Sequence, residues 1–313
     1  MRSCSLLLTE WGFSNLAASR RSADITAQED SMEALKALIG TVVGATLVFF
    51  AGAAMADWKL SDLNATINAT NFIVGDGCSG TLISLKHRLV LTNHHCITNY
   101  ISAREREEVQ RDGTTKKVKR EERTDVPLSQ RSYQGTRQVG STNYLSVIVA
   151  HWQQSDLALL QIRSETLPYT VASQVLPEGQ TVQRGEQVYI VGNPAGLDAT
   201  LTSGIVSSTT RMAKVSWSDG GEVAFIQFSG GSYFGNSGGA LYNSKGHLIG
   251  VPAAMVGTSH LALAIHYKSI QQFLTDNCFG EVWSEKAESF DVCDEKRQPK
   301  VAGRDVKSSP TKE

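Results

Sequence analysis

The chain has 313 residues, of which 41% are hydrophobic and 27 are glycine, and its formal net charge is −1 at pH 7. This composition excludes an intrinsically disordered protein and is typical of a globular, strand-rich one. The nearly neutral charge gives no electrostatic reason to expect nucleic acid as a partner, because binding to phosphate backbones usually requires a basic excess.

The segment Ala37–Ala56, with the sequence ALIGTVVGATLVFFAGAAMA, contains no charged residue. Its apolar core and its small-x-small ending at Ala56 predict a secretory signal peptide that is cleaved before Asp57. The protein would then be secreted or periplasmic. Because about 20 apolar residues can also span a bilayer, a retained membrane anchor is the alternative. Residues 1–31 of this N-terminal extension carry several acidic side chains, which a signal peptide seldom has at its start, so one hypothesis is that synthesis begins at Met32.

Short apolar runs alternate with Gly, Asn, Asp and Ser from residue 57 to residue 277. They include GTLISL, HRLVLT, YLSVIVA, LALLQI, EQVYIVG, TSGIVSS, EVAFIQF, GALYN, HLIGVPA and LALAIH. Runs of this length and composition predict strands, and their number predicts an all-β sandwich or a pair of barrels. Helical spacing occurs in Tyr267–Asn277, where Ile270, Phe273 and Leu274 are apolar, so we expect a terminal helix packed on the β body.

Two segments are polar. Residues 104–137 are rich in charges of both signs and contain an RDG turn, which predicts a solvated hairpin or loop. Residues 281–313 are polar to the end of the chain, which predicts a disordered tail.

Five cysteines are present, and Cys4 lies in the N-terminal extension. The remaining four allow three pairings, and closeness in sequence favours disulfides Cys78–Cys96 and Cys278–Cys293. Disulfides fit the oxidising compartment that the signal peptide implies. No CxxC or His-rich pairing is present, so no metal site is predicted.

Three short motifs carry the residue types of nucleophilic catalysis. TNHHC places His95 after an apolar run, SDLALL places Asp156 before one, and GNSGG places Ser237 in a glycine-rich turn. These motifs, in this order, resemble the chymotrypsin-type serine peptidases, in particular their HtrA-like, trypsin-like branch. The segment Val191–Ser208, VGNPAGLDATLTSGIVSS, is similar to the GNP…GIVS segment of that branch. The resemblance covers roughly Asn71–Phe273.

The resemblance implies an all-β, chymotrypsin-like fold of two six-stranded antiparallel Greek-key barrels with a short C-terminal helix. The protease domain would span 57–280, with barrel one at about 57–165, barrel two at about 175–266 and the helix at about 267–277. A serine endopeptidase with protein or peptide substrates follows, without cofactor or metal. We expect a monomer, which would contact a membrane only if Ala37–Ala56 is retained. The residues after Asn277 are too few for the PDZ domain that HtrA proteins usually add.

The chemistry assigns each motif a role. A serine hydroxyl needs a base, so His95 would take the proton of Ser237 while Asp156 holds the other ring nitrogen. The N–H groups of Gly235 and Ser237 would form the oxyanion hole, and glycine allows the backbone conformation that such a turn needs. Asn236 cannot form the charge pair through which animal trypsin-like zymogens are activated, so we expect an active site that needs no such activation.

The resemblance implies a specificity pocket with Gly231, six residues before Ser237, at its base. Ala253 would line its wall and His260 would lie nearby. An uncharged base predicts a preference for small or medium apolar residues. Two other functions stay open, a catalytically inactive binding module with the protease fold and a membrane-anchored processing protease. An α/β-hydrolase esterase is disfavoured because its nucleophile precedes its acid and histidine.

Overall fold

The computed structural model describes residues 60–110, 112–134, 137–164, 167, 170–217, 221–257 and 260–297, which all belong to one compact unit, Asp57–Glu313. Cys4 and the signal or anchor segment Ala37–Ala56 lie outside the described residues. Among the described residues, no helix combines the length and the apolar character that crossing a membrane requires.

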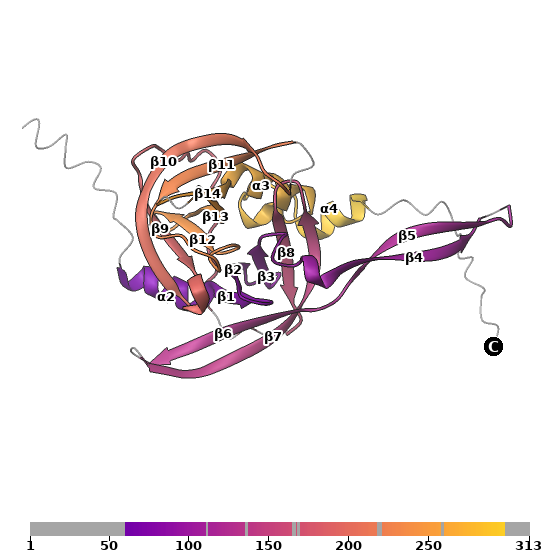
Figure 1. Ribbon diagram of the computed structural model, residues 1–313, viewed down its shortest axis with the longest axis horizontal. Coiled ribbons are helices and arrows are strands. Elements are labelled where there is room, and N and C mark those ends of the chain that lie inside the picture. The colour runs from indigo at the N-terminus through magenta and orange to yellow at the C-terminus, as the bar shows by residue number, and fades with distance from the viewer. Residues whose placement is uncertain are drawn as a thin grey trace, which may run out of the picture. The chain divides into compact units, whose positions relative to one another are not determined.

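Two closed six-stranded antiparallel barrels form the body of this unit, which confirms the expected fold (Figure 1). In the order in which they pair, the strands of barrel one are β1 (Asn71–Val74), β2 (Cys78–Ser84), β3 (Leu89–Thr92), β8 (Leu157–Ile162), β7 (Arg137–Trp152) and β6 (Val126–Gln134). Those of barrel two are β10 (Thr200–Lys214), β11 (Glu222–Ser229), β14 (Leu261–His266), β13 (Leu248–Met255), β12 (Ala240–Asn243) and β9 (Gln187–Gly192).

The surroundings of strand β8 explain why its sequence, LALLQI, does not alternate between apolar and polar residues. Successive side chains of a strand point to opposite faces. Ala158, Leu160 and Ile162 pack in the core of barrel one, whereas Leu157 and Leu159 pack in a second cluster that both barrels share. Both faces of β8 are therefore buried, and four consecutive apolar residues, Leu157–Leu160, result.

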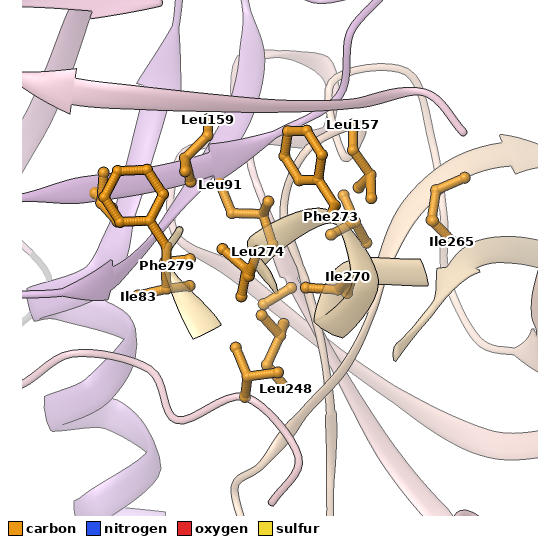
Figure 2. Close-up of a cluster of buried hydrophobic side chains, with 14 of the residues drawn as sticks. Ile83, Leu91, Leu157, Leu159, Leu248, Ile265, Ile270, Phe273, Leu274 and Phe279 are labelled. Carbon is orange, nitrogen blue, oxygen red and sulfur yellow. The ribbon is translucent and has the colours of Figure 1, made fainter. Parts of the chain in front are cut away.

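Helix α3 (Tyr267–Asp276) completes the shared cluster. Its residues Ile270, Phe273 and Leu274 are buried, and they lie among side chains from both barrels (Figure 2). Barrel one contributes Leu91 and barrel two contributes Ile265, among others. The helix predicted from the spacing of these apolar residues is therefore confirmed, and it joins the two barrels.

The charge-rich segment after the short 3₁₀ helix η1 (Thr98–Tyr100) forms a hairpin of β4 (Ile101–Val109) and β5 (Thr115–Arg123). These strands pair only with each other, as a separate two-stranded sheet (Figure 1). Opposite charges face each other across it, as at Glu105 and Lys119. Such pairs stabilise an exposed hairpin modestly. The prediction of a solvated hairpin over 104–137 agrees with the structure as far as Arg123, whereas β6 (Val126–Gln134) is a strand of barrel one in which Val126 and Leu128 are buried.

Besides η1, the described residues form helical elements that the sequence pattern did not indicate, at both ends of the unit and, for η2, between β9 and β10. They are α2 (Leu60–Thr70), the 3₁₀ helices η2 (Pro194–Gly196) and η3 (Gly280–Val282), and α4 (Phe290–Arg297). The α4 helix lies inside the segment expected to be disordered. Phe290 stacks on Phe279 at a centroid distance of 4.9 Å, and the disulfide Cys278–Cys293 ties α4 to the body. These two contacts order the segment as far as Arg297; the residues beyond it lie outside the described part.

The N-terminus of α3 makes stability depend on pH. His266 is the N-cap residue, and its Nδ1 accepts a hydrogen bond of 3.0 Å from the backbone N–H of Lys268. Burial, and then the charge of Lys268, lowers the pKa of His266 from 6.5 to about 4. A lowered pKa in the folded state means that the unfolded chain binds this proton first as pH falls. The free energy of unfolding is therefore expected to fall by about 2 kcal/mol between pH 6.5 and pH 4.

Urea unfolding at a series of pH values measures this dependence. His266→Asn is the matched variant, because asparagine caps helices well and does not titrate. The difference in stability between wild type and variant should shrink or reverse as pH falls through this range. A difference that stays constant with pH would exclude His266 as the titrating group.

Candidate active site

His95 and Asp156 are brought together by neighbouring strands of barrel one. His95 follows β3 and Asp156 precedes β8, and these strands pair with Thr92 opposite Ala158. Asp156 is fully buried. Its Oδ2 lies 2.8 Å from His95 Nδ1, and its Oδ1 accepts a 2.9 Å hydrogen bond from the backbone N–H of His95. Because an ionised carboxylate only accepts, Nδ1 carries the proton, and Nε2 is left with a free lone pair.

His94, the other histidine of the pair, does not join this arrangement. Its ring stacks on that of His151 at a centroid distance of 5.0 Å. Burial, followed by the neighbouring His151, lowers the pKa of His94. Of the two adjacent histidines, it is therefore His95 whose ring contacts Asp156.

Ser237 lies in the turn before β12 of barrel two, and each backbone carbonyl of this turn has a hydrogen-bond donor. Phe234 O accepts from Ala195 N at 2.8 Å, and Asn236 O accepts from Gly239 N at 2.9 Å. Ser79 supplies the other two donors, its Oγ to Gly235 O at 2.6 Å and its N–H to Ser237 O at 2.8 Å.

These bonds orient the peptide planes of the turn. In a trans peptide, the N–H points opposite to the preceding carbonyl. The carbonyls of Phe234 and Asn236 are held toward their own donors, so the N–H groups of Gly235 and Ser237 point away from these donors. Neither N–H, nor the Ser237 hydroxyl, has a hydrogen-bond partner in the part of the chain that the structure describes. The turn therefore presents two free donors beside a free hydroxyl.

Glycine is required at position 235. Its φ is +100°, which residues with a side chain rarely adopt, and an added Cβ would lie 2.3 Å from the carbonyl oxygen of Asn193. Asn236, next in the chain, is buried and carries no charge.

A pocket of about 350 Å³ contains both His95 and Ser237. Its other lining residues are Trp217, Ser232, Tyr233, Phe234, Pro252, Ala253, Ala254 and Met255. Of the three residues expected at the specificity pocket, Ala253 is among these lining residues. Gly231 and His260 are not part of this lining; the Gly231 carbonyl accepts from Thr202 Oγ1, and the His260 carbonyl accepts from Gly230 N.

The aromatic side chains of the pocket were not predicted. Trp217 comes from the connection between β10 and β11, and its ring lies 6.3 Å from that of His95. Its Nε1 is buried and has no hydrogen-bond partner among the described residues. Tyr233 and Phe234 are exposed and stand edge to face at 5.5 Å. Their position directly before GNSGG was an available signal, whereas no local motif marks Trp217.

The disulfide Cys78–Cys96 lies beside His95, and ligand atoms of these three residues lie within 4.8 Å of one another. The two sulfurs are bonded to each other, so they are not available as thiolate ligands for a metal. The bond instead ties the start of β2 to the residue after His95. Both expected disulfides, this one and Cys278–Cys293, are present.

Comparison with known families identifies this architecture. A family model described as a trypsin-like peptidase domain matches residues 78–251, which is more than half of the chain. The chain belongs to the trypsin-like peptidase family. The match begins at Cys78 on β2 and ends at Val251 on β13, so it includes His95, Asp156 and Ser237.

Similar curated proteins place this trypsin-like peptidase domain close to the HtrA group. Serine protease HTRA2, mitochondrial, of Bos taurus is 40% identical over 134 residues, which are 42% of this chain and 28% of that protein. Serine protease HTRA1A of Danio rerio is 34% identical over 125 residues, 40% of this chain and 25% of that protein. HhoB of Synechocystis sp. is 35% identical over 126 residues, 40% of this chain and 29% of that protein. The chain thus matches between a quarter and a third of the length of these relatives.

Proposed function

We propose that the protein is a serine endopeptidase that cleaves proteins or peptides through an acyl-enzyme. The observation that carries the proposal is the buried Asp156 carboxylate, 2.8 Å from His95 Nδ1, in a pocket that also contains Ser237. Family membership supports the same reaction class. We further propose that the protein is secreted, as a monomer, after cleavage at Ala56.

In the proposed reaction, each group acts once when the acyl-enzyme forms and once when it is hydrolysed. His95 Nε2 takes the Ser237 proton while Oγ attacks the carbonyl carbon of the scissile peptide bond. The tetrahedral oxyanion accepts hydrogen bonds from the N–H groups of Gly235 and Ser237. The imidazolium, stabilised by Asp156, donates its proton to the leaving amine, and the acyl-enzyme remains. Water then attacks the acyl-enzyme in the same way and restores Ser237. The hydrogen bond from Ser237 to His95 forms as substrate closes the site, since such bonds are often long in the free enzyme.

The pocket supports a preference for apolar side chains at the cleavage site. Its walls come from Ala253, Ala254, Met255 and Pro252, with aromatic rings at its rim. No charged side chain other than the titratable His95 is among its described lining residues, so a buried lysine or aspartate of the substrate would lose its hydration without a partner.

Labelling with a fluorophosphonate probe tests the proposal, because the probe phosphonylates only an activated serine. The full-length protein is expected to carry one label, which mass spectrometry should map to Ser237, and to cleave an unfolded protein such as casein. Ser237→Ala should lose both. Ser232→Ala is the matched control, since Ser232 lines the same pocket, and it should keep the label. A folded wild type without label or turnover would support the inactive binding module instead.

A further inference from the structure

Ser79 connects barrel one to the turn that carries Ser237. We propose that Ser79, oriented by Asn193, positions the oxyanion hole and is required for its full effect. This inference rests on the peptidase function proposed above. Ser79 lies on β2, is fully buried, and holds Gly235 O with its hydroxyl and Ser237 O with its backbone N–H. One residue of barrel one thus fixes two carbonyls of the turn in barrel two.

The direction of the Ser79 hydroxyl proton follows from its neighbours. A hydroxyl has one proton to donate and two lone pairs to accept with. Asn193 donates to Ser79 Oγ twice, from its backbone N at 2.8 Å and from Nδ2 at 3.0 Å. With both lone pairs occupied, the proton of Ser79 must go to its third neighbour, Gly235 O.

Asn193 is itself held in one orientation. Its Nδ2 also donates to Phe72 O at 2.9 Å, and its Oδ1 accepts from Asn71 Nδ2 at 2.9 Å and from Ala199 N at 3.0 Å. Every donor and acceptor of this side chain is therefore used, and its 1% exposure excludes water as a competitor. A buried side chain whose donors and acceptors are all satisfied is held rigidly. The hydrogen bonds of Asn193 span both barrels, because Asn71 and Phe72 belong to β1 and Asn193 follows β9.

The consequence for the reaction concerns the peptide between Gly235 and Asn236. Glycine leaves the backbone free to rotate about its own φ and ψ. This peptide links the two peptides that carry the oxyanion-hole donors, the N–H of Gly235 before it and the N–H of Ser237 after it. Without a donor for Gly235 O, the linking plane can turn, and the two N–H groups are no longer held steadily toward one oxyanion. Ser79 does not touch the substrate pocket, so substrate binding should be spared. The role assigned to Ser79 is positioning, not catalysis.

Ser79→Ala in the full-length protein tests this role. We expect kcat to fall by roughly 10- to 100-fold, which is less than the loss for a missing donor, with KM within about twofold of wild type. A second readout separates positioning from folding. A peptide aldehyde forms an oxyanion with Ser237, whereas the corresponding peptide alcohol does not. The aldehyde should bind about 10- to 100-fold more weakly, and the alcohol should bind as before.

Ser146→Ala is the matched control, because Ser146 is equally buried in barrel one and its Oγ also donates to a backbone carbonyl, that of Val126. It should leave both readouts unchanged. If Ser79→Ala does not fold, Asn71→Ala removes one donor to Asn193 Oδ1 and leaves Ser79 in place. It should lower kcat several-fold, with the same selective loss of aldehyde binding. Unchanged kcat in the variant that folds, or equal loss of aldehyde and alcohol binding, would overturn the inference. Wild-type protein without turnover or label would overturn the proposed function instead.

Discussion

Replacing Asp156 with asparagine is expected to lower kcat by about 10⁴-fold at neutral pH. The backbone N–H of His95 donates to Oδ1, so the amide oxygen of the variant would take that place. The amide NH₂ would then face His95 Nδ1, to which it can only donate. This favours the tautomer with its proton on Nε2, which cannot accept the proton of Ser237.

Steady-state hydrolysis of a peptide substrate measures this effect. Asp125→Asn is the control, since Asp125 is an aspartate on the surface that pairs with Arg163. It should change kcat by less than about twofold. A variant at Asp156 that keeps more than about a tenth of wild-type kcat would show that His95 does not depend on this carboxylate.

Gly235→Ala is expected to lower kcat by about 10²- to 10³-fold, the usual loss for one oxyanion donor. The new Cβ would lie 2.3 Å from Asn193 O, and the φ of +100° is strained for alanine. The turn must shift to relieve both, and the Gly235 N–H leaves its position. Reaction of Ser237 with a fluorophosphonate should slow as well, because its phosphoryl oxygen would use the same donors.

Gly185→Ala separates the effect of backbone strain from the effect of the steric clash. Gly185 also has a positive φ, of +85°, but an added Cβ there meets no atom within 4 Å. This control carries the backbone strain without the clash, and its kcat should stay close to wild type. Equal activity of both variants would contradict the assignment of Gly235 to the oxyanion hole.

Much of the fold could be predicted because buried strands and helices show a regular pattern of apolar residues in the local sequence. Each of the ten apolar runs corresponds to a strand, and the spacing of Ile270, Phe273 and Leu274 corresponds to α3. The strands β1 and β6 are not among these runs, because β1 has only four residues and β6 is mostly polar. Strand β6 closes barrel one by pairing with β1 and β7. The order of α4 depends on a disulfide and on ring stacking, which its own polar sequence does not report.

The residues of the site likewise fall into those that a local motif indicates and those that it does not. His95, Asp156 and Ser237 stand in motifs of a few residues, so a single sequence sufficed to propose them. Ser79 lies beside Cys78 in the sequence, but its side chain forms hydrogen bonds to residues 114 and 156 positions away. Trp217 reaches the pocket from a connection between strands. Contacts of this range follow from how the barrels close, which no short motif encodes.

The place of α3 has a consequence for the order of events during biosynthesis. Barrel one, with His95 and Asp156, leaves the ribosome long before Ser237, and the helix whose side chains fill the seam between the barrels emerges later still. Until α3 has docked, the apolar surfaces that bring the two halves of the catalytic apparatus together lie uncovered. A nascent chain of the proposed peptidase would therefore become active only after Tyr267–Asp276 has been made, which protects the chain itself from premature cleavage.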